Sequence, residues 1–253
     1  MSATAESSKL LNFFRDFNPA CVEFDGRPQI IHEVFLDQSE TQHSLETIIL
    51  GMLGKILFGN LSGDILIFLS GEKSIRQVHD QIKGLLREEK YKERAGLVEL
   101  NMLFKDLPLP EQQQVSKDMY NSEGERFRKI ILATNLAETS ITLPHLVFVI
   151  DSGQNNMPLF NFEYRGVELR EVPNSKAQAD QRRGRVGRVQ VGYWMPCFTE
   201  EDYKNLVPAA PDALSRADLT LPLLKVLSLP SVDGHLERFP WFSEFDPCSP
   251  SCR

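Results

Sequence analysis

The sequence has 253 residues, of which 42% are hydrophobic and 25% charged, the composition of an ordinary globular protein of one or two domains. It contains no uninterrupted apolar stretch of the roughly 18 residues that would predict a membrane span, and its start, MSATAESSKL, lacks the basic-then-apolar layout of a secretory signal. The net charge of −7 argues against a protein that holds nucleic acid by bulk charge, because such binding depends on neutralising many phosphates. Any nucleic-acid contact must therefore be local.

The four cysteines, at positions 21, 197, 248 and 252, are too scattered for a disulfide framework. This usage favours a reducing compartment, so we expect an intracellular protein of the cytoplasm or nucleus, with no membrane partner. Cys248 and Cys252 would make half of a metal site, but the sequence offers no second half. We therefore predict no metal site in this chain.

Apolar periodicity predicts strands and helices that alternate along the chain from residue 30 onward. Strands are expected at 30–36, 64–69, 98–104, 129–134 and 146–151, several of them continuous apolar runs typical of strands buried on both faces. Helices are expected at 44–58, at 72–86, and over the glutamines at 112–114 after Pro110. In the polar start of the chain, Phe13, Phe14 and Phe17 are spaced like one helical face.

Strands that alternate with helices indicate a parallel sheet with helices on both faces, so the predicted fold class is α/β. We expect this domain to cover residues 22–205, after an N-terminal extension at 1–21. Beyond it, four prolines punctuate the chain around one amphipathic helix at 219–227. Residues 206–253 are therefore expected to be a short, mostly helical tail, the start of a region that is truncated here.

The strongest local signal is the segment QRRGRVGR at 181–188, with four arginines and two glycines. Arginine always carries its charge and presents a planar fork that suits phosphate oxygens. At a spacing of three, Arg182, Arg185 and Arg188 would lie along one side of a helix, beside glycines that let another surface come close. A solvated basic helix is the alternative, but each glycine would weaken such a helix by about 1 kcal/mol relative to alanine. The segment therefore predicts a phosphate-binding role.

A second signal is the segment ATNLAETSIT at 133–142, which follows the expected strand at 129–134. It lies at a strand's carboxyl end, where ligands bind in open α/β sheets, and its hydroxyl and amide groups suit phosphate and ribose contacts. The alternative is a helix-capping turn with Thr134 or Asn135 as N-cap. Both interpretations can hold together, because a helix N-terminus also offers free amides to a phosphate.

These two segments occur in order with FDGRPQIIHEVFL at 24–36, GDILIFLSGEKSI at 63–75, VFVIDSG at 147–153, SKAQADQ at 175–181 and PCFTEEDY at 196–203. Over roughly residues 22–230 the series resembles the DEAH-box family of superfamily 2 helicases. The resemblance implies the second RecA-like domain of an ATP-dependent RNA helicase, followed at 206–253 by the start of a winged-helix-like region. It implies ATP with Mg²⁺ as cofactor. The implied partners are RNA, single-stranded or at a duplex junction, a first RecA-like domain in cis or in trans, and an activating protein.

The resemblance also assigns roles to individual residues. Gln181, Arg185 and Arg188 match the catalytic positions that face the γ-phosphate, where the two arginines act as arginine fingers and stabilise charge in the transition state. Thr142 matches a position near the ribose of the nucleotide. Positions that contact RNA or relay the nucleotide state are matched by Ser70, Gly71, Thr134, Asn135 and Ser140. The stretch at 155–172 resembles the β-hairpin with which such helicases part strands.

Departures from the family pattern bear on activity. Pro144 stands where many members have an aspartate near the ribose, and Ser116 where the family has a base-stacking phenylalanine, with Tyr120 as the candidate substitute. The sequence has no Gly-x-x-x-x-Gly-Lys-Ser/Thr loop and no Asp-Glu-x-His sequence, which hold phosphates and magnesium in the first RecA-like domain. We therefore expect the chain alone to be inactive. The alternatives are a catalytically inactive RNA- or protein-interaction module and a related DNA helicase or viral NTPase.

Overall fold

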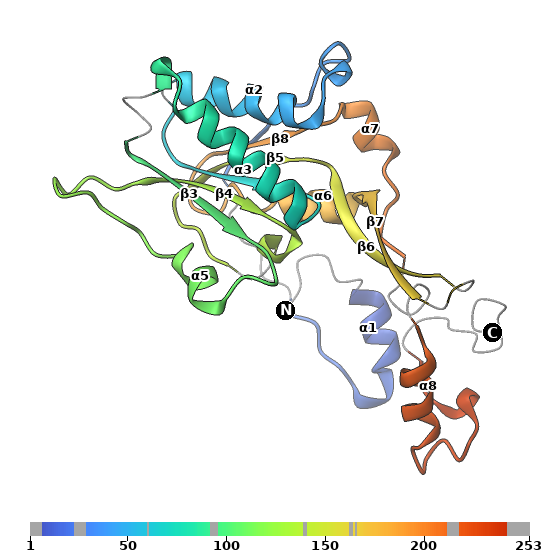
Figure 1. Ribbon diagram of the computed structural model, residues 1–253. Coiled ribbons are helices and arrows are strands. Elements are labelled where there is room, and N and C mark those ends of the chain that lie inside the picture. Colours follow the sequence, from blue (N-terminus) through green and yellow to red (C-terminus); the bar gives the residue numbers. More distant parts are fainter. Residues whose placement is uncertain are drawn as a thin grey trace. The chain divides into compact units, whose positions relative to one another are not determined.

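The computed structural model describes residues 7–22, 29–59, 61–91, 96–138, 141–161, 164, 166–211 and 218–241 (Figure 1). The chain divides into two compact units. The sheet unit consists of Asp25–Asn156 and Glu171–Ala209, and the small unit of Met1–Phe24, Met157–Arg170 and Ala210–Arg253. The domain boundaries expected from the sequence stay a prediction.

Six parallel strands form the sheet of the sheet unit, in the order β1-β8-β5-β2-β4-β3. They are β1 (Ile31–Glu33), β2 (Asp64–Phe68), β3 (Val98–Leu103), β4 (Arg128–Ala133), β5 (Leu146–Asp151) and β8 (Gly192–Pro196). The predicted α/β fold with a parallel sheet is thereby confirmed. β1 is shorter than the expected strand at 30–36, because it lies at the edge of the sheet and pairs with β8 alone.

Helices connect these strands, and most begin at a residue suited to that position. They are α2 (Leu45–Phe58), α3 (Glu72–Leu86), α5 (Leu109–Gln114), α6 (Lys176–Arg183) and α7 (Glu200–Asn205), with 3-10 helices at Glu40–Gln42, Glu89–Tyr91 and Asn135–Glu138. Ser44 caps α2 with its side chain, and capping boxes begin α6 at Ser175 and α7 at Thr199. The helices predicted at 44–58, at 72–86 and after Pro110 are confirmed.

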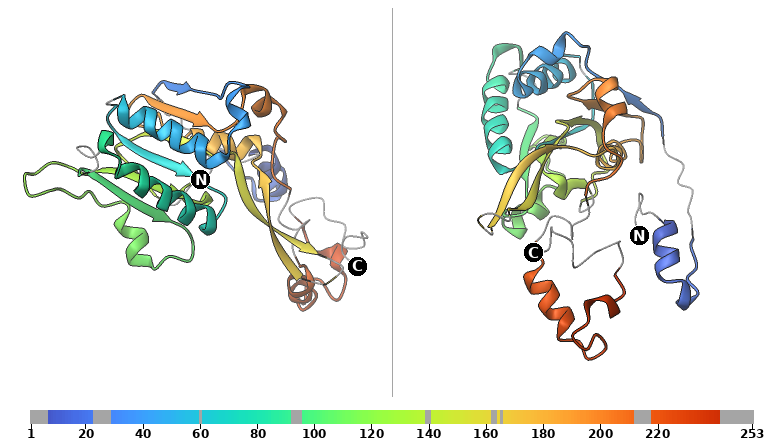
Figure 2. Two further views of the ribbon diagram at one scale, coloured as in Figure 1. Left: turned by 45° about the horizontal axis from the view of Figure 1, so that its top comes forward. Right: turned by 90° about the vertical axis from the view of Figure 1, so that its right-hand side faces the viewer.

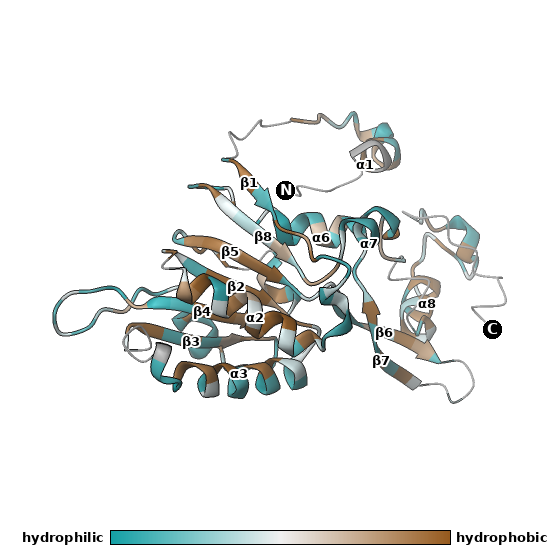
Figure 3. Ribbon diagram, turned by 90° about the horizontal axis from the view of Figure 1, so that it is seen from above, coloured by the Kyte–Doolittle hydropathy of each residue, from teal (hydrophilic) through white to brown (hydrophobic). Residues whose placement is uncertain are grey.

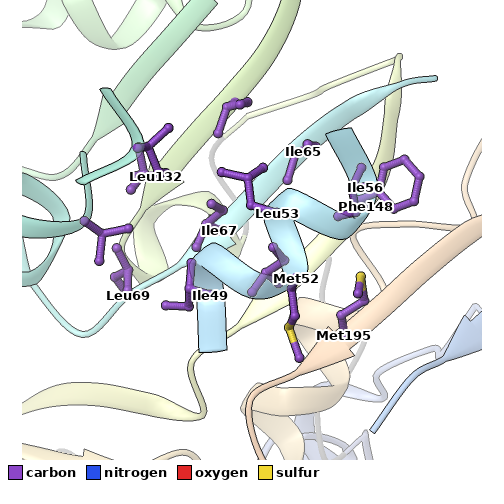
Figure 4. Packing of buried hydrophobic residues seen from close by; sticks show 14 of the residues in the cluster. Ile49, Met52, Leu53, Ile56, Ile65, Ile67, Leu69, Leu132, Phe148 and Met195 are labelled. Atoms are coloured by element: carbon purple, nitrogen blue, oxygen red, sulfur yellow. The ribbon is translucent and has the colours of Figure 1, made fainter. Parts of the chain in front are cut away.

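Alternate side chains of the central strands enter two separate cores, one on each face of the sheet. On one face, Ile65 and Ile67 of β2 pack under α2 and α3, which lie side by side in Figure 2, and Figure 4 shows α2 side chains over these isoleucines. On the other face, Leu66 and Phe68 pack with Trp194 of β8 and with α6. Burial on both faces explains the uninterrupted apolar runs, which colour the middle of the sheet brown in Figure 3.

The amino ends of the strands carry a network of buried and half-buried charges. Arg126 forms a two-pronged ion pair with Asp64 at the start of β2, over 2.9 and 2.6 Å, and its Nε donates to Asp118 at 2.8 Å. Lys129 is 1% exposed, and its ammonium group donates to two main-chain carbonyls of the segment 115–117. The hydrogen bond from Arg126 outweighs burial and holds the pKa of Asp118 below its usual value. This network ties the chain before β4 to the edge of the sheet.

Strands β6 (Gln154–Asn161) and β7 (Gly166–Pro173) pair with each other in a two-stranded sheet. They confirm the hairpin expected at 155–172, while its strand-parting role stays a prediction. The hairpin is inserted between β5 and α6, so it lengthens the crossover from β5 to β8. Its first and last residues belong to the sheet unit, and residues 157–170 belong to the small unit.

The small unit also contains two helices, α1 (Ser7–Phe13) and α8 (Thr220–Leu227), and 3-10 helices at Arg15–Phe17 and Leu236–Arg238. The helix α8 confirms the one predicted at 219–227. The helix α1 ends at Phe13 and Phe17 lies in the 3-10 helix, so the expected single helical face of three phenylalanines is wrong. Among the described residues, no helix combines the length and the apolar character that crossing a membrane requires.

Candidate functional site

The carboxyl ends of β2, β4 and β5 lie side by side at one edge of the sheet, because these strands are parallel neighbours. Ser70 and Gly71 follow β2, and Thr134 and Asn135 follow β4. Four of the residues singled out in the sequence are therefore brought to one edge. Ligands bind at this edge in open α/β sheets.

Ser70 and Gly71 pack against the base of the hairpin. The hydroxyl of Ser70, a residue that is 5% exposed, donates to a carboxylate oxygen of Glu171 and lies 3.0 Å from the hydroxyl of Ser74. A Cβ atom on Gly71 would lie 2.4 Å from Nδ2 of Asn156, so a larger residue would have to displace that amide. The Ser70 side chain is thus engaged within the protein, and both residues help to hold the first and last residues of the hairpin.

The loop after β4 begins with a 3-10 turn at Asn135–Glu138. Thr134 precedes it, and its carbonyl and hydroxyl accept two amides of the turn at 3.1 and 3.5 Å. The capping interpretation is therefore right, with Thr134 as the capping residue. Asn135 and Thr142 are exposed, whereas Ser140 lies outside the described residues.

The arginine segment is helical only at its start. The helix α6 ends at Arg183 and Gly184 is its C-cap. The prediction that Arg182, Arg185 and Arg188 share one side of a helix is therefore wrong. Arg182 is fully buried, Arg185 is 5% exposed and Arg188 is exposed, so the three guanidinium groups have three different environments.

The conformation of Gly187 excludes a helix that runs through the whole arginine segment. Its φ of 71° is left-handed, a conformation that glycine adopts without strain. A Cβ atom at this position would lie 2.5 Å from Cγ1 of Ile31 and 3.1 Å from the carbonyl oxygen of Gln29, and the amide of Gln29 donates to the Gly187 carbonyl at 2.8 Å. The expectation that a glycine lets another surface approach is thus confirmed at Gly187, where Gln29 and Ile31, the first residue of β1, lie against it. At Gly184 the nearest atoms are carbonyls of its own helix.

Arg182 is the centre of a buried ion-pair cluster at the carboxyl edge. Its Nη1 donates to Oδ1 of Asp151, the last residue of β5, at 2.7 Å, and to the carbonyl of Gln154 at 3.2 Å. Its Nε donates to Oε1 of Glu138 at 2.9 Å, and its guanidinium lies over the ring of Phe68. Three separate segments of the chain therefore meet at one side chain.

The charges of this cluster influence one another. Burial opposes the charge of Arg182, but Asp151 and Glu138 outweigh it and raise the pKa of Arg182. Burial also raises the pKa of Glu138, against the opposing attraction of Arg182. Sequence reasoning missed this cluster. The signal that could have found it is an aspartate at the end of an apolar strand, which needs a cationic partner when buried.

Arg185 lies against the loop after β4. Its Nη1 donates to the carbonyl of Glu138 at 3.4 Å and its Nη2 donates to the carbonyl of Ile141. Its Nε is buried and has no hydrogen-bond partner within the described part of the chain. Burial, reinforced by repulsion from Arg188, lowers the pKa of Arg185 to about 10. Arg185 therefore remains charged at neutral pH.

Two other predicted residues accompany Arg185. Arg188 is exposed, and its Nε donates to the carbonyl of Gly184 at 3.0 Å. Gln181 is partly buried in the last turn of α6. The structure thus places Arg185 and Arg188 within electrostatic reach of each other, although not on one helical face.

Arg183 has a different environment from the other arginines. It forms ion pairs with Glu33 of β1 at 2.8 Å and with Asp180 at 3.1 Å. Its guanidinium also lies 5.9 Å from the ring of Trp194. These contacts make Arg183 a structural link between α6 and the outermost strand, β1.

The positions that depart from the family pattern lie at the surface. Ser116, Tyr120 and Pro144 are exposed, and Tyr120 forms an isolated bridge with Arg126 before β4. Within the described ranges, no group of three or more His, Cys, Asp or Glu side chains could hold a metal ion. Cys248 and Cys252 lie outside those ranges.

Comparison with known proteins agrees with this architecture. The family model of the helicase conserved C-terminal domain matches residues 49–190. The chain is 34% identical over 168 residues to the ATP-dependent RNA helicase HrpA of Borreliella burgdorferi, a match that covers 66% of this chain and 19% of that protein. It is 32% identical over 241 residues to a Schizosaccharomyces pombe protein that carries the name of a pre-mRNA-splicing factor ATP-dependent RNA helicase, covering 95% of this chain and 36% of that protein.

Solved structures show the same fold. The crystal structure of the Escherichia coli DEAH/RHA helicase HrpB matches with a TM-score of 0.78 at 24% identity, over 96% of this chain and 29% of that one. The chain thus spans between 19% and 36% of the length of these relatives. The family match, the order of the sequence segments and the parallel sheet agree. The chain belongs to the helicase conserved C-terminal domain family, as a RecA-like domain of the DEAH-box helicases of superfamily 2.

Proposed function

We propose that this chain is the C-terminal motor domain of an ATP-dependent RNA helicase. In that role it supplies arginine fingers and RNA-backbone contacts for ATP hydrolysis coupled to strand translocation and unwinding. The observation that carries the proposal is the pair Arg185 and Arg188. The two guanidinium groups are close enough for the charge of one to lower the pKa of the other, and they lie beside the loop at the carboxyl edge of the sheet.

The residues at this edge suit an anionic nucleotide. Arg188 is exposed, Arg185 is charged, and Thr142 and Asn135 are exposed polar side chains. We expect Arg185, Arg188 and Gln181 to face the γ-phosphate and Thr142 to lie near the ribose. Preorganised guanidinium groups stabilise the charge that spreads over the phosphoryl oxygens, an effect worth about 10³ to 10⁵ in rate in comparable NTPases.

Binding of the phosphate requires a local change at Arg185. In this structure two of its nitrogens donate to main-chain carbonyls of the loop after β4. A phosphate oxygen is a stronger acceptor for a guanidinium than a neutral carbonyl, because both partners are charged. We therefore expect Arg185 to exchange at least one carbonyl for the phosphate when ATP is held between this chain and a first RecA-like domain. That domain, in cis or in trans, would supply the ligands of Mg²⁺.

RNA contacts are proposed for Ser70, Gly71, Thr134, Asn135 and Ser140. Of the described residues in this set, Asn135 is exposed and the Ser70 hydroxyl is engaged by Glu171. We therefore expect main-chain groups at 70–71 and the side chain of Asn135 to contact the RNA backbone. Such placed contacts fit a chain whose net charge is −7, because they do not depend on a basic surface.

A second candidate is a catalytically inactive module that binds RNA or protein. The observation that favours it is the inward orientation of Arg185, whose two Nη atoms donate to the loop. The exposed Ser116 and Pro144, at positions where the family has nucleotide contacts, favour it as well. The two candidates differ in whether these arginines affect turnover.

The test is kinetic and uses this chain together with a competent first RecA-like domain. Replacing Arg185 or Arg188 with alanine should lower kcat for RNA-stimulated ATP hydrolysis steeply and change the KM for ATP comparatively little. Arg185→Lys should restore little, because an ammonium group cannot reproduce the two-pronged contact.

Arg183→Ala is the matched control from the same segment. Because Arg183 is ion-paired with Glu33 and Asp180, its loss should reduce thermal stability slightly and leave kcat nearly unchanged. Equal and mild losses of kcat at positions 183, 185 and 188 would refute the finger assignment and favour the inactive module.

A further inference from the structure

Glu138 is held at both of its polar groups by the arginine segment. Its carboxylate accepts Nε of Arg182 at 2.9 Å, and its main-chain carbonyl accepts Nη1 of Arg185 at 3.4 Å. Arg182 is itself fixed by Asp151 at 2.7 Å and by the carbonyl of Gln154. A continuous series of contacts therefore runs from the end of β5 through Arg182 and Glu138 to Arg185.

We propose that Arg182 is a positioning residue for Arg185, which it sets in place through Glu138. The proposal rests on the function proposed above and adds to it a residue that does not face the nucleotide. Arg182 is 0% exposed, so it acts on the reaction only through its neighbours. By fixing the Glu138 side chain, it fixes the position of one of the two carbonyls that hold Arg185 in the loop.

The composition of the cluster supports more than a stabilising role. Removing a guanidinium and two carboxylates from water is costly, and well-packed apolar residues often stabilise a core as well or better. The cluster also leaves Nη2 of Arg182 and Oδ2 of Asp151 buried with no hydrogen-bond partner in the described structure. Unsatisfied buried groups lower stability. The cluster therefore does not maximise stability, and a requirement for a defined geometry explains its composition better.

The geometry depends on the planar fork of arginine. One guanidinium reaches a carboxylate on β5, a carbonyl at the start of β6 and a carboxylate in the loop after β4. A lysine at this position would retain the charge but could not donate along all three directions. Arg182→Lys thus separates positioning from charge.

The experiment is a double-mutant cycle in a protein that combines this chain with a first RecA-like domain. Arg182→Lys and Glu138→Gln are each made alone and together with Arg185→Ala, and kcat and KM for RNA-stimulated ATP hydrolysis are measured. Each single change should lower kcat by about tenfold to 100-fold with a smaller change in KM, because a small displacement of a catalytic group reduces the rate by factors of this order. In the Arg185→Ala background the same changes should lower kcat by less than about twofold, because the residue being positioned is gone.

Arg126→Lys provides the matched control. Arg126 also forms a two-pronged pair with a buried aspartate, but it is itself half-buried and lies at the amino edge of the sheet. The Arg126→Lys substitution should lower the melting temperature, while its effect on kcat should be small and equal with Arg185 present and in the Arg185→Ala background. Should Arg182→Lys fail to fold, Glu138→Gln carries the test, since it keeps the shape of the side chain and leaves Arg182 paired with Asp151.

The outcomes separate this inference from the proposed function. Loss of kcat in Arg185→Ala together with a non-additive cycle supports both. The same loss with fully additive effects of Arg182→Lys and Glu138→Gln overturns the positioning role alone. Normal turnover in Arg185→Ala overturns the proposed function, and the inference with it.

Discussion

Replacing Gly187 with alanine tests the structure of the arginine segment directly. If residues 181–188 formed one continuous helix, as their spacing suggests, alanine at 184 or at 187 would stabilise it by about 1 kcal/mol. In the structure the two positions differ, because Gly187 has a φ of 71° and Gly184 a φ of −67°. Gly187→Ala should therefore destabilise the protein much more than Gly184→Ala.

The expected cost at Gly187 follows from two contributions. A left-handed backbone costs an alanine about 1–2 kcal/mol relative to glycine. The added Cβ would lie 2.5 Å from Cγ1 of Ile31 and 3.1 Å from the carbonyl of Gln29, and relieving such overpacking costs about 1–3 kcal/mol. The free energy of unfolding should thus fall by about 2–5 kcal/mol, which lowers the melting temperature by on the order of 10 °C in a domain of this size. At Gly184 the added Cβ would lie 3.3 Å from the carbonyl oxygen of Asp180 and the backbone is not left-handed, so Gly184→Ala should change the free energy of unfolding by less than about 1 kcal/mol.

Fluorescence of Trp194 can follow this unfolding. Trp194 is fully buried in the sheet unit, and the sequence has two tryptophans, so a Trp241→Phe background leaves one reporter. Urea titrations of the two glycine variants in that background give the difference in free energy. Equal stabilisation by both alanines would refute the left-handed turn at Gly187 and restore the continuous helix.

Three further predictions concern activity and the charged amino edge. The isolated chain should show no RNA-stimulated phosphate release near the rate of about 1 s⁻¹ that enzymes commonly reach, and a steady-state assay that finds such turnover would contradict the need for a first RecA-like domain. Arg126→Ala should lower the free energy of unfolding by about 3–5 kcal/mol, since it leaves Asp64 buried without its partner, and a loss below about 1 kcal/mol in a urea titration would show that the pair is dispensable. The pKa of Asp118 lies below its usual 3.8, so its stabilisation is present above that pH and lost as the pH falls through its lower folded value. The melting temperature of Asp118→Asn should therefore lie below that of the parent at about pH 6, and the difference should shrink as the pH falls below 3.8; a difference that stays constant would refute this.

Periodicity predicted two kinds of element in the sheet unit: strands buried on both faces and helices with one buried face. The strand Asp64–Phe68 is covered on both faces, so nearly every position is apolar and the run is visible in the sequence. The helix Leu45–Phe58 is capped by Ser44, whose side chain accepts an amide of the first turn. A capping serine next to the first apolar residues of a helix can be recognised in the sequence itself. Elements of this kind are specified by residues close together in the chain.

The end of α6 and the burial of Arg182 could not be predicted in the same way. A helix through residue 188 is excluded because Gly187 adopts a left-handed conformation against Ile31, a residue more than 150 positions earlier, while the local spacing of arginines fits a longer helix equally well. Arg182 is buried because Asp151 and Glu138 converge on it from two other segments. Both features depend on tertiary contacts, which local periodicity does not contain.

The environment of Lys129 makes it a chemical reporter. Its ammonium group is enclosed by main-chain carbonyls and is 1% exposed, so acetylating or other amine-reactive reagents cannot reach it in the folded sheet unit. Exposed lysines would react at once, whereas Lys129 would react only when β4 separates from the segment before it. Its rate of modification, read by mass spectrometry of one peptide, therefore measures how often β4 separates from the segment 115–117. A ligand that binds only the form in which this segment is closed should slow the reaction without touching the lysine.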